Sequence, residues 1–414
     1  MGRKRSPGLR LRSGIWHIEK RVNGVQLCES CKTSSLAEAE AYLAKRIEEV
    51  RKATQFGVRP RRKWRQAATY YLETNMHKAS IADDATHLEQ LDSYIGSLWL
   101  DQVHDATLKP FVDARKKAGR KSKTVNLALG VVRRILNLAT RSWRDEYGLT
   151  WLETAPLITM LPLNDAAQPY PLDWDEERRL FQMLPSHLAD MSLYKVNTGA
   201  REQEVCHLRW EWEIPVPELS TSVFLVPAWV NNGDDIVGLV KNRKDRLHAL
   251  NDVALSVIDK MRTERPTYHL ERCKSKSGGK CNCAHCVVFT YRGYQVGKMH
   301  NNGWKTAWKK AGLPTGPEWK KGVHNLKHTF GRRLRAAGVP RETRTALLGH
   351  WDGNITTHYS AAEIGELIEG ANAPLKAKTG KSPALTLIKL RAAGETVSGK
   401  SSAVKFERKK TATE

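Results

Sequence analysis

The chain has 414 residues and is 40% hydrophobic, which is enough apolar sequence for the cores of two or three domains. Its 68 Lys and Arg residues against 44 Asp and Glu residues leave a net charge of +24, which favours a polyanionic partner such as nucleic acid. No apolar run reaches the roughly 18 residues of a membrane span and no signal peptide is recognisable, so we expect a cytoplasmic, nucleoid-associated protein whose cysteines form no structural disulfides.

The N-terminal residues predict a small module of strands and one helix. A basic arm over residues 1–13 precedes two short strands in RSGIWHIEKRVNGVQLCES, which the favoured turn pair Asn23 and Gly24 would join as a hairpin. Ser35 and Glu38 have the spacing of a capping box and would begin a helix that runs to about Lys52. The stretch TQFGVRPRRK then reads as a linker to the next domain.

Residues 64–150 are expected to form a helical domain. Apolar residues recur at helical spacing in AATYYLETN, DDATHLEQLDSYIG and KTVNLALGVVRRILNLATRSW. In the last of these helices the expected core residues are Val125, Leu129, Val132, Leu136 and Leu138. The basic residues Lys121, Lys123, Arg133, Arg134 and Arg141 would face either solvent or DNA phosphates.

A proline-containing stretch over 146–172 reads as an interdomain linker, and residues 173–370 carry the candidate chemistry. We expect this region to begin with a helix after Asp173 and to end in further helices. Between them we expect a strand in SVFLVPAWV and a hairpin near IVGLVKNRKDRLHAL. The basic tail over 371–414 shows little periodicity and is expected to be flexible, with LTLIKL as a candidate docking element.

Basic and imidazole side chains in the 173–370 region suit phosphate chemistry. Phosphoryl transfer without a metal needs positive donors around the phosphate and a nucleophile in line with the leaving oxygen. No acidic cluster for magnesium and no Gly-rich phosphate loop stands beside them. Arg201 has the forked geometry that suits a phosphate oxygen, and Glu204, one helical turn later, can orient it, although the pair also fits a surface ion pair. The catalytic candidates are Arg201, Lys241, His324, Lys327, His350 and Tyr359.

One predicted helix carries three of the candidates on a single face. His324, Lys327 and His328 fall at positions i, i+3 and i+4, and Gly338 and Pro340 would end the helix. The opposite face is apolar and is expected in the core, through Leu326, Phe330 and Leu334. Histidines are often packed in cores, but two histidines and a lysine on one face would be costly to bury.

The order and local sequences of these motifs resemble the tyrosine recombinase family, and within it the phage-type (lambda-like) integrases. The resemblance implies a multidomain, mainly α fold with small β elements. Its parts would be an arm-type DNA-binding module (1–55), a helical core-binding domain (64–150), a mixed α+β catalytic domain (173–370) and the basic tail (371–414).

The resemblance also implies the roles of the candidates. Tyr359 would be the nucleophile and would form a 3′-phosphotyrosyl link, so that no ATP is needed. Lys241 would protonate the leaving 5′-oxygen, with Lys244 as its competitor for this role. Lys327 stands where the family usually has a second arginine, which leaves open a less active enzyme, a subfamily variant or help from another arginine; we favour the variant.

The remaining candidates follow from the same helix and from the segment after it. His324 would accept a proton or donate to the phosphate, with His328 as a supporting residue, and His350 would hydrogen-bond the same phosphate. Ser360 and Glu363 form a second capping box, which would start a helix immediately after Tyr359.

A cysteine cluster lies inside the catalytic region. Cys273, Cys281, Cys283 and Cys286 can close a tetrahedral structural zinc site, or they can remain free thiols, and the spacing does not decide between the two. No cofactor is expected for catalysis itself.

The expected activity is site-specific DNA recombination that integrates or excises a phage or mobile element in a bacterial host. The expected partners are double-stranded DNA, three further copies of the chain in a homo-tetramer, and accessory DNA-bending or directionality proteins, with no membrane. The alternatives are a type IB topoisomerase-like activity and a DNA-binding protein without catalysis. The target sites cannot be read from the sequence.

Overall fold

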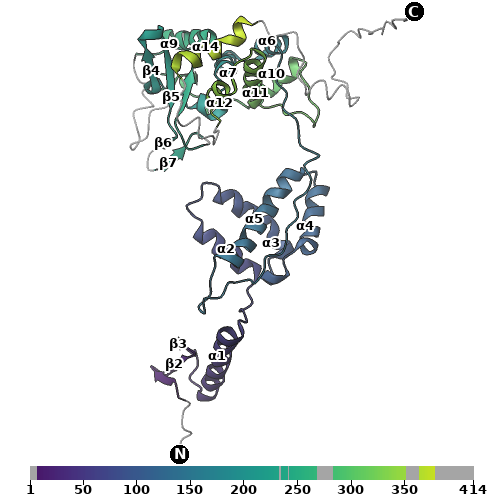
Figure 1. Cartoon of the computed structure of the whole chain (residues 1–414), viewed down its shortest axis with the longest axis vertical. Helices are drawn as coiled ribbons and strands as arrows, with labels where there is room; N and C mark the ends of the chain where they lie inside the picture. Colours follow the sequence, from purple (N-terminus) through teal and green to yellow (C-terminus); the bar gives the residue numbers. More distant parts are fainter. Residues whose placement is uncertain (1–6, 233–234, 241, 268–282, 351–362, 378–414) are drawn as a thin grey trace, which may run out of the picture. The chain divides into compact units, whose positions relative to one another are not determined.

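The computed structural model describes residues 7–232, 235–240, 242–267, 283–350 and 363–377 (Figure 1). The chain divides into two compact units, which are residues 1–166 and 167–414. Among the helices described, none is both long enough and apolar enough to cross a bilayer.

A three-stranded antiparallel sheet begins the first unit and packs against one helix. The sheet has the order β1-β2-β3, and Asn23 and Gly24 turn β2 into β3 with positive φ angles of 46° and 85°, as the predicted hairpin requires. The strands are β1 (Leu9–Arg12), β2 (Ile15–Val22) and β3 (Val25–Ser30), and the helix is α1 (Leu36–Phe56). Apolar residues of both fill a small core: Leu9, Ile18, Leu27, Ala39, Leu43 and Val50.

The capping box predicted at the start of α1 is wrong. Ser35 is the N-cap residue, but its side chain makes no capping hydrogen bond. The neighbouring Thr33 takes both roles instead, because its hydroxyl donates to the Glu38 carboxylate and accepts from the Ser35 amide at 3.1 Å. A threonine two residues upstream therefore competes successfully for the glutamate that the box requires.

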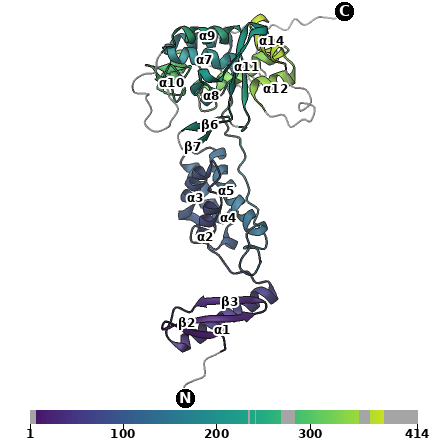
Figure 2. The same cartoon turned by 90° about the vertical axis from the view of Figure 1, so that its left-hand side faces the viewer.

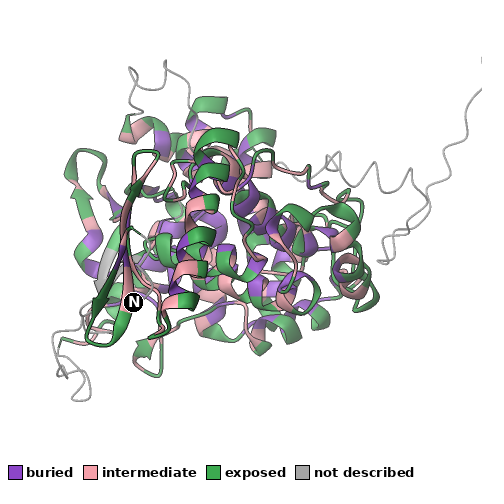
Figure 3. Cartoon of the chain, turned by 90° about the horizontal axis from the view of Figure 1, so that it is seen from below, coloured by how far each residue is buried: buried purple, intermediate pink, exposed green. Residues whose placement is uncertain are grey.

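Four helices and a short 3₁₀ turn form the helical part of the first unit, and Figure 3 shows buried and exposed stripes along helices of the molecule. They are α2 (Trp64–Thr74), α3 (Ile81–Ile95), η1 (Leu100–Gln102), α4 (Asp105–Lys117) and α5 (Ser122–Arg141). On α5 the expected core residues are buried, except that Leu138 is half-buried. The five basic residues predicted to face outward are all exposed.

The stretch read as a linker is in part a packed segment of this helical core. Leu152 and Ile158 are buried among the helices, and Asn126 of α5 exchanges hydrogen bonds with the backbone of Leu161. Asp165 accepts a hydrogen bond from the Ser122 amide at 2.7 Å and pairs with Lys116 at 2.9 Å, at the start of α5. Prolines signalled irregular backbone correctly, but irregular backbone can still be packed.

The second unit is built around α7 and α11. In Figure 1, α9 and the larger sheet lie to the left of α7, whereas α6 and α10 lie to its right; Figure 2 shows the same unit from the side. Its helices are α6 (Trp174–Met183), α7 (Ser186–Thr198), α8 (Glu202–Cys206), η2 (Trp210–Trp212), η3 (Pro217–Leu219), α9 (Asp252–Thr263), α10 (Asn302–Lys310), α11 (His324–Ala336), α12 (Arg341–Leu348) and α14 (Ile364–Lys376). The helix expected after Asp173 is α6, which Asp173 and Glu176 cap reciprocally.

The strands of this unit are β4 (Glu213–Val216), β5 (Thr221–Val226), β6 (Trp229–Asn232), β7 (Asp235–Gly238), β8 (Arg246–Ala249), β9 (Thr290–Tyr291) and β10 (Tyr294–Gln295). The hairpin predicted within residues 236–250 is wrong in its pairing. β7 pairs with β6, and β8 adds to β5 in a sheet of order β4-β5-β8, with Phe224 opposite His248. β5 is largely buried and offers a free edge, so the mostly buried β8 packs there instead of pairing with β7.

Candidate active site

Arg201 lies at the turn between α7 and α8, beside a buried carboxylate. Gly199 ends α7 in the left-handed region with φ 64°, which turns the chain so that Arg201 becomes the N-cap residue of α8. Glu204 is fully buried and accepts hydrogen bonds from the Arg201 amide at 2.7 Å and from Arg201 Nη1 at 2.9 Å. The side chain of Arg201 remains 21% exposed, so Glu204 orients a guanidinium that solvent can still reach.

A buried layer lies behind Glu204 and comes from β8 and α7. Arg246 Nη1 donates to Glu204 Oε2, and His248 Nε2 approaches the same oxygen at 3.4 Å. The Tyr194 hydroxyl is hydrogen-bonded to the other ring nitrogen of His248, Nδ1, at 2.9 Å. Burial opposes ionisation of Glu204, yet the hydrogen bond from His248 and the charge of Arg246 hold the pKa of this carboxyl well below its ordinary value. Burial also lowers the pKa of His248 to about 4, so this ring is neutral at pH 7.

The predicted helix face that carries His324, Lys327 and His328 is the first turn of α11. His324 is exposed, His328 is half-buried, and their rings meet edge to face with centroids 4.9 Å apart. Lys327 is only 5% exposed. Burial first, and then the charges of Arg246 and Arg201, lower the pKa of Lys327 to about 6. Partial burial, His328 and Lys195 lower the pKa of His324 to about 4.

The end of α12 ties these segments together. Gly349 adopts φ 56°, and the amides of Gly349 and His350 bond back to the carbonyls of Ala346 and Thr345, which is a Schellman motif. The next three carbonyl oxygens each accept a hydrogen bond from a cationic side chain, which suits the negative end of a helix. The pairs are Arg246 Nη2 with Leu347 at 3.2 Å, Lys327 Nζ with Leu348 at 2.5 Å, and Arg201 Nη2 with Gly349 at 3.3 Å.

His350 follows immediately and is exposed. Partial burial, and then the charges of Lys327 and Arg201, lower its pKa. The structure therefore brings Arg201, Glu204, Lys327 and His350 together, with His324 and His328 on the same helix turn as Lys327.

Sequence reasoning missed three buried basic residues of this site, namely Lys195, Arg246 and His248. Lys195 of α7 is fully buried and donates a hydrogen bond to the carbonyl of Ala200, directly before Arg201. Burial lowers the pKa of Lys195 to about 7. A signal was present for the other two, because an arginine and a histidine in the otherwise apolar RLHAL strand are unusual residues for a buried strand.

Positive groups dominate the electrostatics of this group of side chains, which we call the cationic cluster. Its members are Arg201, His324, Lys327, His328 and His350. The pKa values of His324, His328, His350 and Lys327 are all lowered, with burial as the largest cause and neighbouring cations next. Such mutual depression is relieved when an anion enters, because an opposite charge favours each protonated form. The arrangement can therefore hold an anion and gain protons as it does so.

Two of the catalytic candidates lie outside the described residues. They are Lys241 and Tyr359, so nothing in the structure tests their roles. The competitor Lys244 is described and is exposed next to a turn in which the Arg243 amide donates to Val240. After the cluster, α14 begins at Ile364 with Glu363 as its N-cap residue, whereas Ser360 of the predicted capping box is not among the described residues.

The cysteine cluster is described only in part. Cys283 is buried and Cys286 is half-buried, in a turn where the Cys286 amide donates to the Cys283 carbonyl at 3.0 Å. Cys273 and Cys281 lie outside the described residues, so the zinc site stays a prediction.

The basic residues of α5 in the first unit make a separate surface. Lys123, Arg134 and Arg141 differ by 11 and 18 positions, which places them on one side of the helix together with Gly130. A Cβ atom added to Gly130 would meet nothing within 4 Å, so this side of α5 is open. Lys121 precedes the helix as its N-cap residue, and Arg133 lies a quarter-turn away.

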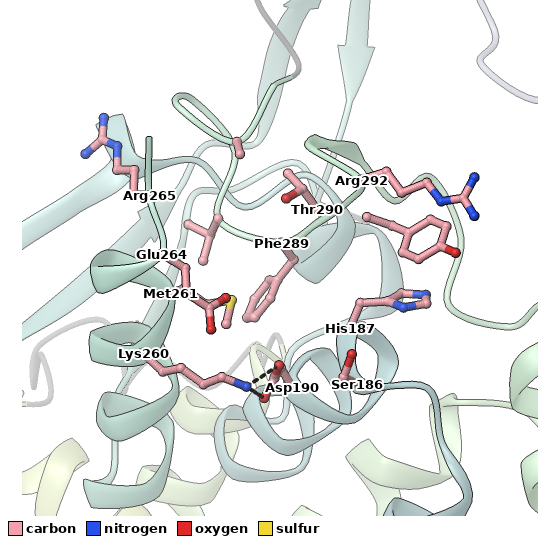
Figure 4. Close-up of a pocket in the computed structure, with 13 residues that line it drawn as sticks. Ser186, His187, Asp190, Lys260, Met261, Glu264, Arg265, Phe289, Thr290 and Arg292 are labelled. Carbon is pink, nitrogen blue, oxygen red and sulfur yellow. Dashed lines mark hydrogen bonds and ion pairs between the residues drawn. The ribbon is translucent and has the colours of Figure 1, made fainter. Parts of the chain in front are cut away.

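A cavity of about 360 Å³ in the second unit shares no lining residue with the cationic cluster (Figure 4). It lies between the first turns of α7, the end of α9 and β9. Lys260 of α9 and Asp190 of α7 form an ion pair there at 2.8 Å. Glu264, Arg265 and Arg292 also line the cavity, so acidic and basic side chains both face it.

Comparisons with known proteins found relatives in sequence and in fold. Residues 172–365 match the model of the Phage integrase family. The integrase of Salmonella phage P22 is 22% identical over 345 residues, which cover 77% of this chain and 81% of that protein. The integrase of transposon Tn1549, solved in complex with a circular intermediate DNA, has a TM-score of 0.54 at 17% identity and covers 75% of this chain and 99% of that chain. The structure of the same integrase in complex with transposon right end DNA has a TM-score of 0.52 at 16% identity. The match covers 75% of this chain and 99% of that chain. The likeness confirms the expected mainly helical, multidomain fold with small sheets.

Proposed function

Since this chain is a tyrosine recombinase of the phage integrase family, we propose that the cluster around Arg201 binds the scissile phosphate of duplex DNA and that Tyr359 attacks it. The observation that carries this proposal is the convergence of Arg201, Lys327 and His350 at the end of α12. These residues come from three distant segments of the chain. Solvent reaches Arg201 and His350, and Lys327 lies largely buried beside them, so the group offers positive and imidazole donors to a phosphate with spread negative charge.

The proposed step conserves the phosphodiester bond energy. The Tyr359 hydroxyl oxygen forms a bond to phosphorus, and the bond from phosphorus to the 5′-oxygen breaks. The products are a 3′-phosphotyrosyl link and a free 5′-hydroxyl, and attack by a 5′-hydroxyl from the other duplex reverses the step. His324 takes the phenol proton, because its ring is neutral at pH 7 and the bound phosphate raises its lowered pKa of about 4, which strengthens it as a base. Lys241 gives a proton to the leaving 5′-oxygen.

Arg201, Lys327 and His350 stabilise the charge that develops on the non-bridging oxygens. Lys327 does so as a point charge, without the bidentate geometry of an arginine. Its position in the cluster, donating to the same helix end as Arg201, supports the view that it replaces the usual arginine in the site.

The proposed assembly is a homo-tetramer on two DNA sites. Each chain supplies one Tyr359, and exchanging both strands of two duplexes requires four cuts, so four copies are needed. The exposed basic side of α5 would hold DNA near the cut, and the N-terminal sheet and α1 would grip DNA sites farther away. The proposed role is integration or excision of a phage or mobile element in the bacterial cytoplasm, on nucleoid DNA, with accessory DNA-bending or directionality proteins.

Suicide-substrate cleavage tests this function. A nick placed just beyond the scissile phosphate lets the 5′-hydroxyl fragment diffuse away, which traps the covalent complex. We expect the wild-type chain to accumulate this complex, and the Tyr359→Phe variant to bind the same DNA without accumulating any. Tyr291→Phe, which removes an exposed hydroxyl of the same unit, is the matched control and should react like the wild type.

A second assay with two full sites separates recombination from the alternatives. Relaxation of supercoiled DNA without joining of the two sites would indicate a topoisomerase-like activity. Binding without any covalent complex would indicate a non-catalytic DNA-binding protein.

A further inference from the structure

The guanidinium of Arg246 connects the segment that carries Arg201 to the segment that carries His350. Arg246 of β8 donates to Glu204 through Nη1, and through Nη2 to the carbonyls of Gly199 at 2.9 Å and Leu347 at 3.2 Å. These partners belong to α8, to the end of α7 and to the end of α12. Arg246 itself is only 4% exposed, so it lies behind the surface on which a phosphate would rest.

The turns that present Arg201 and His350 are built against this side chain. Gly199 and Gly349 both adopt left-handed backbone, with φ angles of 64° and 56°. A Cβ atom at Gly349 would lie 2.6 Å from Arg246 Nε, a distance at which the guanidinium would have to move. The turn before His350 therefore requires a glycine at position 349, both for its left-handed backbone and to leave room for the side chain of Arg246.

Burying an arginine adds little to the stability of a fold. Its charge must leave water, and the gain from pairing offsets that cost only when the geometry is very good. Arg246 Nε has no hydrogen-bond partner, so the pairing is incomplete. Apolar residues in place of both Arg246 and Glu204 would fill the same space without burying charge, so keeping the pair points to a function beyond stability.

We propose that Arg246 is a positioning residue for the proposed strand cleavage, and that it fixes the phosphate clamp Arg201 and the donor His350 in one geometry through Glu204 and the end of α12. The inference rests on the proposed function, because its main consequence is a slower chemical step. Arg246 does not touch the DNA. Its positive charge also contributes to the lowered pKa of Lys327 and of His350, in each case after burial.

The test is single-turnover cleavage of the suicide substrate by full-length variants. Arg246→Met should lower the cleavage rate constant at saturating DNA by about 10²-fold, the scale of a misplacement of about 1 Å. The DNA concentration at half-saturation should change by less than about threefold, because binding rests on many other phosphate contacts. A purely structural role would instead lower the reacting fraction and leave the rate constant of the folded molecules unchanged.

Arg333→Met is the matched control. Arg333 is also a buried arginine of this unit, paired with Glu177 at 2.8 Å, and it has no hydrogen bond or ion pair with the described residues of the cluster. The Arg333→Met variant should keep the wild-type rate constant within about threefold even if its Tm falls. The proposal is overturned if Arg246→Met keeps its rate constant, or if Arg333→Met loses as much.

Arg246→Lys covers the case in which Arg246→Met does not fold. Lysine keeps the charge but cannot reach Glu204 and both carbonyls at once, so we expect a rate constant at least about tenfold below that of the wild type. A wild-type rate in this variant contradicts the proposal.

If the wild-type chain itself forms no covalent complex, the proposed function fails, and NMR of His350 then decides the positioning role. The His350 ring resonance should move in Arg246→Lys and stay in Arg333→Met; an unmoved resonance in Arg246→Lys overturns the inference.

Discussion

Lys327 Nζ donates a hydrogen bond to the backbone carbonyl of Leu348 at 2.5 Å, joining the first turn of α11 to the last turn of α12. The side chain that we propose to replace the family's second arginine is therefore held by a helix end. The same ammonium is the group that we place against the scissile phosphate. Because a lysine has three donor hydrogens, it can keep the carbonyl and still bind a phosphate oxygen.

Replacing Lys327 should separate charge from geometry. We expect Lys327→Ala to slow cleavage strongly, since it removes both the charge and the contact with Leu348. Lys327→Arg should keep or raise the rate, because a guanidinium restores bidentate phosphate contact. The measurement is the single-turnover rate constant on the suicide substrate. An alanine variant that cleaves at the wild-type rate would place this lysine outside the chemistry.

The pH dependence of DNA binding should also depend on Lys327. Burial and neighbouring cations lower its pKa to about 6, so much of the free protein lacks this proton at pH 7. A bound phosphate favours the charged form and raises the pKa, so binding takes up a proton above pH 6. Affinity should therefore fall as pH rises from 6 to 8, by up to about tenfold per pH unit for one proton.

Lys327→Arg provides the control, because arginine stays protonated throughout this range. Anisotropy titrations at constant ionic strength should show a steeper loss of affinity with pH for the wild type than for the arginine variant. Parallel curves would mean that Lys327 does not titrate on binding.

The basic side of α5 should contribute phosphate contacts. Alanine at Lys123, Arg134 or Arg141 should each reduce the slope of log affinity against log salt by about 1. Lys109→Ala on α4 is the control, because Lys109 is exposed but paired with Asp113 at 2.7 Å. The measurement is binding of core-site DNA at several salt concentrations. Equal slopes for all four variants and the wild type would remove this surface from the DNA interface.

The N-terminal module should matter for full-length sites but not for cutting. Deleting residues 1–60 should spare cleavage of a short crossover-site substrate, because none of the described residues of the cluster lies there. It should impair recombination between full-length sites, since linked DNA grips raise the effective concentration, and it should lower the salt dependence of binding to them.

The structure supplies a check on this truncation. Arg46 of α1 pairs with Glu146 at 3.1 Å and contacts Tyr147 at 3.3 Å, so the deletion removes partners of that segment. Tm and solubility must therefore be measured beside activity. A soluble truncated chain that recombines full-length sites at the normal rate would contradict the arm-module reading.

Zinc analysis tests the cysteine cluster. Protein purified without chelator should contain one equivalent of zinc if Cys273, Cys281, Cys283 and Cys286 form a structural site. Less than about a tenth of an equivalent, with all four thiols open to titration, would exclude the site.

Local sequence spacing predicted much of the site, but the roles of its buried residues depend on tertiary packing. Arg201 and Glu204 lie one turn apart, and α11 carries its polar face at helical spacing, so both could be read from the sequence. Arg246 and Lys195 gain their roles from partners more than 40 positions away or from the inside of a turn, which no periodicity indicates. The β5 and β8 pairing was missed for the same reason, because a buried edge is a property of the assembled fold. At Ser35 a local rule failed, since Thr33 took its partner.

The most direct test of the account identifies the residue that becomes joined to DNA. The trapped complex is digested with protease and nuclease, and the peptide that carries a nucleotide is sequenced by mass spectrometry. We predict a 3′-phosphonucleotide on Tyr359 and its disappearance in Tyr359→Phe. An adduct on any other residue, or an undiminished covalent complex in Tyr359→Phe, would contradict it.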